Sequence, residues 1–342
     1  MSMPDTSMTW EELLDEYFFS HNLRQVTEDS YVKVVKGFRK YIGAEVLPDK
    51  ITHRDVLKWR RHTLKERKLS ANTWNNKVTH LRAIFNFGIE EGLIEQDKNP
   101  FNDVAVQKDK KKKKTLTREQ LTKIYLLMQR VESEESHAPW GRRCALYPAW
   151  YWLTVLDTLR YTGMRQNQLL HLRLQDINLD EGFIELRLEG SKTHREWRVP
   201  VVRQLRVRLA RLLAQAKLAG ARPFDMLFDV NRFAPSRRHH DEYQYDEAQA
   251  LQSTRSFFRR LARDCGFAVT AHRFRHTLAT ELMKTPDRNL QLVKDLLGHS
   301  SVSTTMEYIE LNMEIVGRTL ETELALHTDI CVDNQLHDLT VM

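Results

Sequence analysis

Four segments in the second half of the chain carry side chains that could act together on a phosphate group. They are residues 161–165 (Tyr-Thr-Gly-Met-Arg), Lys192, residues 272–276 (His-Arg-Phe-Arg-His), and residues 296–299 (Leu-Leu-Gly-His) followed nine positions later by Tyr308. Guanidinium groups present paired N–H donors that match the geometry of phosphate oxygens. A tyrosine phenol becomes a nucleophile when a base takes its proton. These residue types therefore indicate attack on a phosphodiester.

In this order and spacing the segments resemble the tyrosine recombinase (phage integrase) family, whose catalytic set is Arg, Lys, His-x-x-Arg, His or Trp, and Tyr. A Thr-Gly-x-Arg sequence or a lone lysine is a weak signal, but the combined match is specific. The resemblance covers nearly the whole chain, because the preceding helical region also looks like the family's core-binding domain. It implies six catalytic residues, namely Arg165, Lys192, His272, Arg275, His299 and Tyr308.

The resemblance also implies a role for each of these residues. Arg165 and Arg275 are expected to clamp the scissile phosphate, where negative charge grows in the transition state. Tyr308 is expected to attack and form a 3′-phosphotyrosine bond, with His272 as its base or as a hydrogen-bonding partner of the phosphate. By the same analogy Lys192 protonates the departing 5′ hydroxyl.

His299 is expected to orient the phosphate, and His276 to be a structural neighbour of His272. We expect no cofactor, because a phosphotyrosine bond retains the energy of the broken phosphodiester. We expect no metal ion either, since arginines, lysine and histidines supply the positive charge. Gln168 departs from the family pattern, in which many members carry an acidic residue three positions after the first arginine, and it leaves the support of Arg165 open.

Other classes of protein fit less well. His272 and His276 have the spacing of a helical zinc pair, but Arg273 stands where H-E-x-x-H has glutamate. The sequence around Lys192 lacks the first glycine of a phosphate-binding loop. Two alternatives stay open: a catalytically silent DNA-binding regulator on the same scaffold, and a type IB topoisomerase. All six expected catalytic positions are filled, which favours an enzyme over a silent regulator. The Leu-Gly-His299 segment and the compact N-terminal helical domain favour a recombinase over a topoisomerase.

The elements that position these residues are mainly helical. In the first part of the chain, apolar spacing predicts helices at 10–20, 28–42 and 53–66, the last capped by Thr52, and a fourth whose stripe is Trp74, Val78, Leu81 and Phe85. Later, a capping box at 117–120 opens a helix. Alternation at 183–188 and 197–201 predicts a β-hairpin around the Lys192 turn.

We therefore predict a mainly α fold with a small β-sheet or hairpin, in two domains that form a C-shaped DNA clamp. Residues 8–103 form the helical core-binding domain and residues 104–115 a basic linker. Residues 116–327 form the tyrosine recombinase catalytic domain with a C-terminal helix, and residues 328–342 a tail. Beginning almost directly with the core-binding domain, the chain is expected to lack a separate arm-binding domain.

The charge distribution points to a polyanionic partner. Lys and Arg number 53 against 46 Asp and Glu, a formal charge of +7, and residues 50–82 are rich in basic side chains. Lys77, His80 and Arg82 lie opposite the apolar stripe of the fourth helix, and Lys111, Lys112 and Lys113 lie in the linker. We predict that these six residues bind DNA. For the helix, spacing alone fits a merely solvated face equally well; for the linker, its position between the domains favours contact with the DNA backbone over a merely solubilising loop.

Composition bounds the remaining expectations. The 342 residues are 41% hydrophobic and include only three scattered cysteines, which predicts a folded protein of a reducing cytoplasm with no disulfide framework. No apolar run is long enough for a membrane span. The resemblance implies a homotetramer acting on double-stranded DNA with short inverted-repeat core sites. Integration of a mobile genetic element, resolution and inversion use the same residues and stay open.

Overall fold

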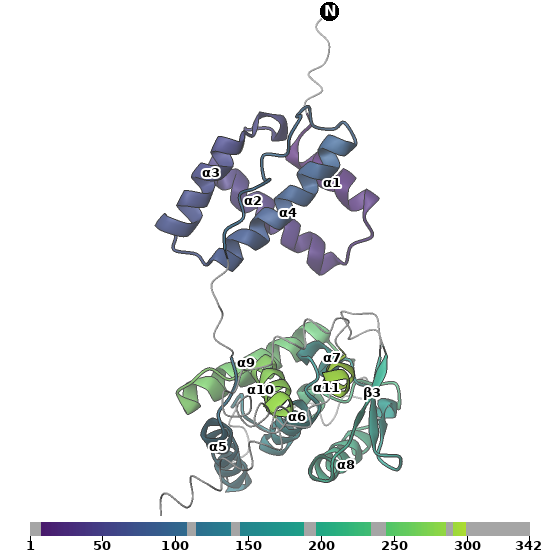
Figure 1. Cartoon of the computed structure of the whole chain (residues 1–342). Coiled ribbons are helices and arrows are strands. Elements are labelled where there is room, and N and C mark those ends of the chain that lie inside the picture. Colours follow the sequence, from purple (N-terminus) through teal and green to yellow (C-terminus); the bar gives the residue numbers. More distant parts are fainter. Residues whose placement is uncertain are drawn as a thin grey trace, which may run out of the picture. The chain divides into compact units, whose positions relative to one another are not determined.

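The computed structural model describes residues 8–107, 114–137, 144–187, 196–233, 244–284 and 290–298. The chain divides into two compact units, Met1–Lys112 and Lys113–Met342, each with its own hydrophobic core (Figure 1). The helical elements, the small sheet and the division into two units confirm the predicted fold class. The finer domain borders stay predictions.

Residues 8–107 of the N-terminal unit contain four α-helices, α1 (Trp10–Ser20), α2 (Gln25–Ile42), α3 (His53–Arg61) and α4 (Ala71–Glu90). A 3₁₀ turn, η1 (Pro48–Lys50), precedes α3, and a π-helical turn, η2 (His62–Glu66), extends it. The Thr52 side chain accepts the Asp55 backbone N–H, as predicted. The helix expected at 28–42 begins three residues earlier, at Gln25, where no side chain caps the first turn to mark the start.

The predicted apolar stripe of α4 is the centre of this unit's core. Trp74, Val78, Leu81 and Phe85 are all buried. Trp74 packs edge-on against Trp59 of α3, with ring centroids 5.1 Å apart, and its indole N–H donates to the Val104 carbonyl at 2.8 Å. The stripe is therefore confirmed as core, which leaves the other face of α4 for the polar residues.

The C-terminal unit is built around one almost fully buried helix, α6 (Ala149–Thr162). Helices α5 (Arg118–His137), α8 (Arg203–Leu218) and α10 (Ala271–Lys284) pack most extensively against it (Figure 1). Trp152 of α6 also stacks face to face on Phe257 of α9 (Glu247–Cys265), with centroids 4.1 Å apart. A helix buried on all sides is held rigidly by its neighbours, so the residues at its end are also held in place.

The described residues of this unit also include two short helices and two 3₁₀ turns: α7 (Gln166–Leu170), α11 (Leu290–Leu297), η3 (Leu174–Asp176) and η5 (Val230–Phe233). Before α5, the Thr117 and Gln120 side chains each accept a hydrogen bond from the other residue's backbone N–H. This reciprocal pair confirms the predicted capping box.

The sheet has three antiparallel strands in the order β1 (Ile177–Asn178), β2 (Phe183–Leu186) and β3 (Trp197–Pro200). Strands β2 and β3 pair Phe183 with Pro200 and Leu186 with Trp197, which confirms the predicted hairpin strands. Strand β1 was not predicted, since two residues are too short to show alternation. Lys192, in the turn, lies outside the described residues. Among the helices described here, none combines the length and apolar character needed to cross a membrane.

Candidate active site

The first predicted arginine lies in the turn that follows the buried helix α6. That helix ends at Gly163, which adopts a left-handed conformation (φ 64°). A Cβ atom there would come within 2.8 Å of both Leu278 of α10 and Leu297 of α11. Glycine is therefore required twice, for the backbone angle and for the close approach. Half-buried Arg165 follows two residues later and leads into α7.

Gln168 holds the main chain of Arg165 in place. Its Oε1 accepts the Arg165 backbone N–H at 2.8 Å, and the side chain is only 3% exposed. The support left open in the sequence is thus supplied by an amide where many family members have a carboxylate. Gln168 Nε2 is buried and has no hydrogen-bond partner within the part of the chain that the structure describes. An unbonded buried donor of this kind costs about 1–3 kcal/mol.

Helix α10 carries the His272-x-x-Arg275 motif and starts at a capping threonine, since Thr270 Oγ1 accepts the Arg273 backbone N–H. Arg275 is buried, with 2% of its surface exposed. Its Nη1 donates to the Gly163 carbonyl at 2.9 Å, and its Nη2 donates to the Leu297 carbonyl at 2.8 Å. One guanidinium therefore joins the turn before Arg165, helix α10 and the end of α11.

The two histidines of the motif are in direct contact. His272 Nε2 and His276 Nε2 are 2.6 Å apart, and the rings meet edge to face with centroids 4.1 Å apart. One nitrogen must donate and the other accept, so the contact sets the tautomers of both rings together. His276, expected only to be a structural neighbour, lies where it can orient His272.

The last residue of the predicted linker, Thr115, and the residue after it, Leu116, are hydrogen-bonded to this same helix. Arg273 Nη1 donates to the Thr115 carbonyl at 3.3 Å, and Thr277 Oγ1 accepts the Leu116 backbone N–H at 2.8 Å. The chain thus enters the C-terminal unit beside the His272 motif. The linker lysines Lys111, Lys112 and Lys113 lie outside the described residues.

Three of the six predicted catalytic residues are described, and they come from segments that meet at the end of α6. Arg275 bonds the turn that leads to Arg165, and it shares α10 with His272. The Leu297 carbonyl, two positions before His299, accepts its other bond. Lys192, His299 and Tyr308 lie beyond the described residues, so their placement here stays a prediction.

The predicted DNA-binding residues of the N-terminal unit are each half-buried on α4. The Lys77 ammonium lies 5.5 Å from the centroid of the Trp59 ring, and burial, with the nearby charge of Arg67, lowers the pKa of Lys77. His80 uses both ring nitrogens inside the unit, with Asn76 O at 2.7 Å and Ser30 Oγ at 3.2 Å. Contact of Lys77, His80 and Arg82 with DNA stays a prediction.

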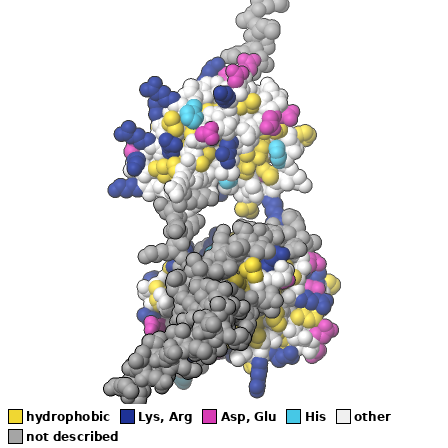
Figure 2. Space-filling view, in the orientation of Figure 1, with side chains coloured by type: hydrophobic (Ala, Val, Ile, Leu, Met, Phe, Trp, Pro, Cys, Tyr) yellow, Lys and Arg dark blue, Asp and Glu magenta, His cyan; other side chains and the backbone are white. Residues whose placement is uncertain are grey.

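A more exposed basic surface lies on α3 and the turn after it. Figure 2 shows Lys and Arg side chains gathered along the edge of the N-terminal unit that carries α3. We call this set the α3 basic face, and its exposed members are Arg54, Lys58, Arg61, Lys65, Arg67 and Lys68. A cluster of exposed like charges suits the repeated phosphates of nucleic acid.

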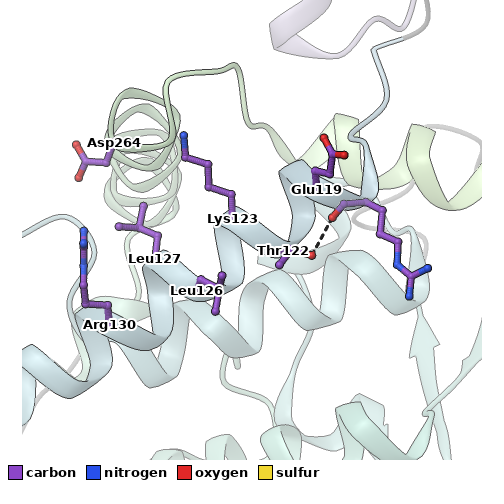
Figure 3. Close-up of a pocket in the computed structure, with 8 residues that line it drawn as sticks. Glu119, Thr122, Lys123, Leu126, Leu127, Arg130 and Asp264 are labelled. Atoms are coloured by element: carbon purple, nitrogen blue, oxygen red, sulfur yellow. Dashed lines mark hydrogen bonds between the residues drawn. The ribbon is translucent and has the colours of Figure 1, made fainter.

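One pocket lies away from the predicted catalytic residues. It has a volume of about 950 Å³ on the surface of α5, and Asp264 of α9 closes one side (Figure 3). Its lining mixes charged side chains, such as Lys123 and Arg130, with Leu126 and Leu127. Of the predicted catalytic residues that the structure describes, Arg165, His272 and Arg275, none belongs to its lining.

Comparison with known proteins identifies the class that this fold and site define. Residues 114–314 match the Phage integrase family, and residues 10–95 match the Phage integrase, N-terminal SAM-like domain. The first match spans the positions of all six predicted catalytic residues. The chain therefore belongs to the phage integrase family, and the resemblance to the tyrosine recombinases seen in the sequence is confirmed.

Curated relatives support this assignment. A putative tyrosine recombinase XerC of Pseudomonas aeruginosa is 39% identical over 90% of this chain and 70% of its own length. Another, from Pseudomonas syringae, is 37% identical over 92% of this chain, and the match spans 64% of that relative's length. This chain therefore spans roughly two thirds of the length of these two relatives.

Solved structures show the same fold. The Tn1549 transposon integrase in complex with a circular intermediate DNA superposes with a TM-score of 0.69 at 19% identity, over 92% of this chain and 100% of that one. A lambda integrase dimer bound to a COC′ core site gives a TM-score of 0.62 at 20% identity, over 90% of this chain and 81% of that one. At these identities the likeness concerns the fold alone.

Proposed function

We propose that this protein is a site-specific DNA recombinase that cleaves and rejoins duplex DNA through a 3′-phosphotyrosine formed by Tyr308. The observation that carries the proposal is the pair of bonds from Arg275 to the Gly163 and Leu297 carbonyls. They gather the turn of Arg165, the helix of His272 and the end of α11 in one place. These segments carry Arg165, Arg275 and His272, residue types that suit the charge of a phosphate in transfer.

The chemistry uses side chains alone. The Tyr308 oxygen attacks the phosphorus, and its proton passes to His272 as the base. The bond from phosphorus to the 5′ oxygen breaks, and Lys192 protonates that oxygen. Arg165 and Arg275 offset the charge that grows on the non-bridging oxygens. His299 orients the same phosphate.

Recombination follows because the step is reversible. The 5′ hydroxyl of a second duplex attacks the phosphotyrosine, restores a phosphodiester and releases Tyr308, so no external energy source is needed. Two such exchanges through a four-way junction complete the reaction, with a homotetramer on two short inverted-repeat core sites. The integrase structures of the same fold are complexes with DNA, which supports a DNA partner. We place the activity in the cytoplasm.

A two-site assay distinguishes the proposed function from its alternatives. Inverted repeats from the DNA that flanks the gene are cloned in pairs, incubated with the protein, and analysed for recombinants and four-way junctions. The proposal predicts both products, dependent on two sites. A topoisomerase would relax plasmids without either site, and a silent regulator would bind without cutting; each of those results would overturn the proposal.

A further inference from the structure

Strand β3, which follows the Lys192 turn, is held against the end of α11 by the side chain of Trp197. This half-buried tryptophan is the first residue of β3 and pairs with Leu186 of β2. Its indole Nε1 donates to the Leu296 carbonyl at 3.2 Å. Its ring lies directly over Gly298, where any Cβ atom would overlap it. Trp197 therefore packs against Leu296 and Gly298, which lie just before His299 in the chain.

The end of α11 is a fixed support for this contact. The Leu297 carbonyl accepts the Arg275 guanidinium, and the Leu297 side chain is fully buried beside Ala279 and Met283 of α10. The Arg275 guanidinium, which also bonds the turn before Arg165, therefore holds the segment to which β3 is attached. Its bonds join Gly163 to Leu297, and the neighbours of Leu297, Leu296 and Gly298, contact Trp197.

The other strand of the hairpin has an anchor of its own. Arg187, directly after β2, donates from Nε to Asp176 Oδ1 at 2.6 Å. Asp176 is buried and also accepts the Arg173 backbone N–H at 2.9 Å. Each strand that leads to the segment with Lys192 is therefore fixed to the body of the unit by one side chain.

We propose that Trp197 is a positioning residue for Lys192. This inference rests on the proposed function, in which Lys192 protonates the leaving 5′ oxygen. A proton donor must lie within hydrogen-bonding distance of its acceptor, roughly 3 Å. A displacement of about 1 Å costs on the order of 100-fold in rate. Lys192 lies five positions before Trp197 in the chain, so we expect release of β3 from Leu296 and Gly298 to displace the strand that follows the lysine segment.

The test determines whether the loss of cleavage rate in Trp197 variants is a loss of proton donation to the leaving oxygen. Wild type, Trp197→Ala, Trp197→Phe and Lys192→Ala are incubated with ordinary DNA and with DNA that has sulfur at the bridging 5′ position. A thiolate leaves without protonation, so the sulfur substrate bypasses the acid. Trp150→Ala is the control, because Trp150 is equally half-buried but contacts Phe233 and Arg211 instead.

We expect Trp197→Ala to form the covalent adduct with ordinary DNA about 10- to 100-fold more slowly than wild type. With the sulfur substrate it should regain most of that loss, as Lys192→Ala does, while Trp150→Ala differs little from wild type on either substrate. Trp197→Phe keeps a ring on Gly298 but loses the Nε1 donor, and a smaller defect with the same recovery is expected. If the alanine variant does not fold, the phenylalanine variant decides.

An equal defect on both substrates would overturn the inference, because it would mean general damage to the site. Rescue of Lys192→Ala without rescue of either Trp197 variant would reject this inference alone and leave the proposed function intact. Failure of wild type to form an adduct with either substrate would reject the proposed function.

Discussion

Arg275 donates from Nη1 to the carbonyl oxygen of Gly163 at 2.9 Å, and so joins α10 to the turn that presents Arg165. The two residues are 112 positions apart in the chain. The second bond, from Nη2 to Leu297, makes the same side chain the link to α11. Arg275 thus organises the site in addition to its proposed contact with the phosphate, and the two predicted arginines should differ in what their loss does to stability.

Arg275→Lys should therefore lower both stability and activity. Lysine keeps the charge, but a single ammonium does not reproduce the paired donors of a guanidinium. A buried carbonyl left unbonded costs about 1–3 kcal/mol of unfolding free energy. Adduct formation should slow by roughly 100-fold or more. Urea unfolding and covalent-adduct assays measure the two effects.

The matched control is Arg165→Lys, at a half-buried position. It should slow adduct formation to a similar degree with much less change in unfolding free energy. Equal stability of the Arg275→Lys variant and wild type would contradict the organising role of Arg275.

Gln168 should be replaceable by glutamate but not by leucine. Glutamate retains the oxygen that accepts the Arg165 N–H, and it removes the buried amide N–H groups of the glutamine. Leucine has a similar size and no acceptor, so it should cost about 1–3 kcal/mol. We expect Gln168→Leu to be the less stable and the slower of the two. Indistinguishable urea unfolding curves and adduct rates would show that the hydrogen bond is unimportant.

The contact between His276 and His272 should affect chemistry more than DNA binding. His276→Leu removes the nitrogen 2.6 Å from His272 Nε2 and should slow adduct formation by about tenfold, with unchanged affinity for DNA. His276→Gln restores a hydrogen-bonding group and should recover part of the rate. His137→Leu, a histidine at the end of α5, is the control. Equal loss of rate in the leucine and glutamine variants would argue against a hydrogen-bonding role.

The α3 basic face should contribute binding without sequence preference. Replacement of Arg61, Lys65 and Arg67 by glutamine should weaken binding to core-site and random duplexes alike. For every phosphate that is no longer neutralised, the dependence of log K on log salt should flatten by about 0.9. The triple replacement of Arg203, Lys217 and Arg222 by glutamine, at exposed positions of the other unit, removes the same number of charges and is the control. An unchanged slope in the α3 variants would exclude this surface from DNA binding.

Local features of the structure were predictable, because they depend on nearby residues. The stripe of Trp74, Val78, Leu81 and Phe85 and the cap at Thr52 are set within one helix, and the structure confirms both. Repeating spacing and a capping side chain are visible in the sequence itself.

Long-range contacts were not predictable in the same way. Nothing near Arg275 in the sequence indicates that the Gly163 and Leu297 carbonyls accept its hydrogen bonds, since these partners depend on how three helices pack. The sequence around Trp197 predicts only the start of a strand, because its partner Leu296 is 99 positions away. His276 was visible at the right spacing, but spacing alone did not distinguish a neighbour from a partner of His272.

The central claim, that Tyr308 joins covalently to DNA, is tested most directly by the adduct itself. Wild type and Tyr308→Phe are incubated with core-site DNA that carries a nick near the cleavage point, denatured, and analysed by gel and by peptide mass spectrometry. We predict an adduct at a peptide containing Tyr308 in wild type, and none in Tyr308→Phe, which should still bind the site. A denaturation-resistant adduct that persists in Tyr308→Phe, or one that maps to another residue in wild type, would contradict the claim.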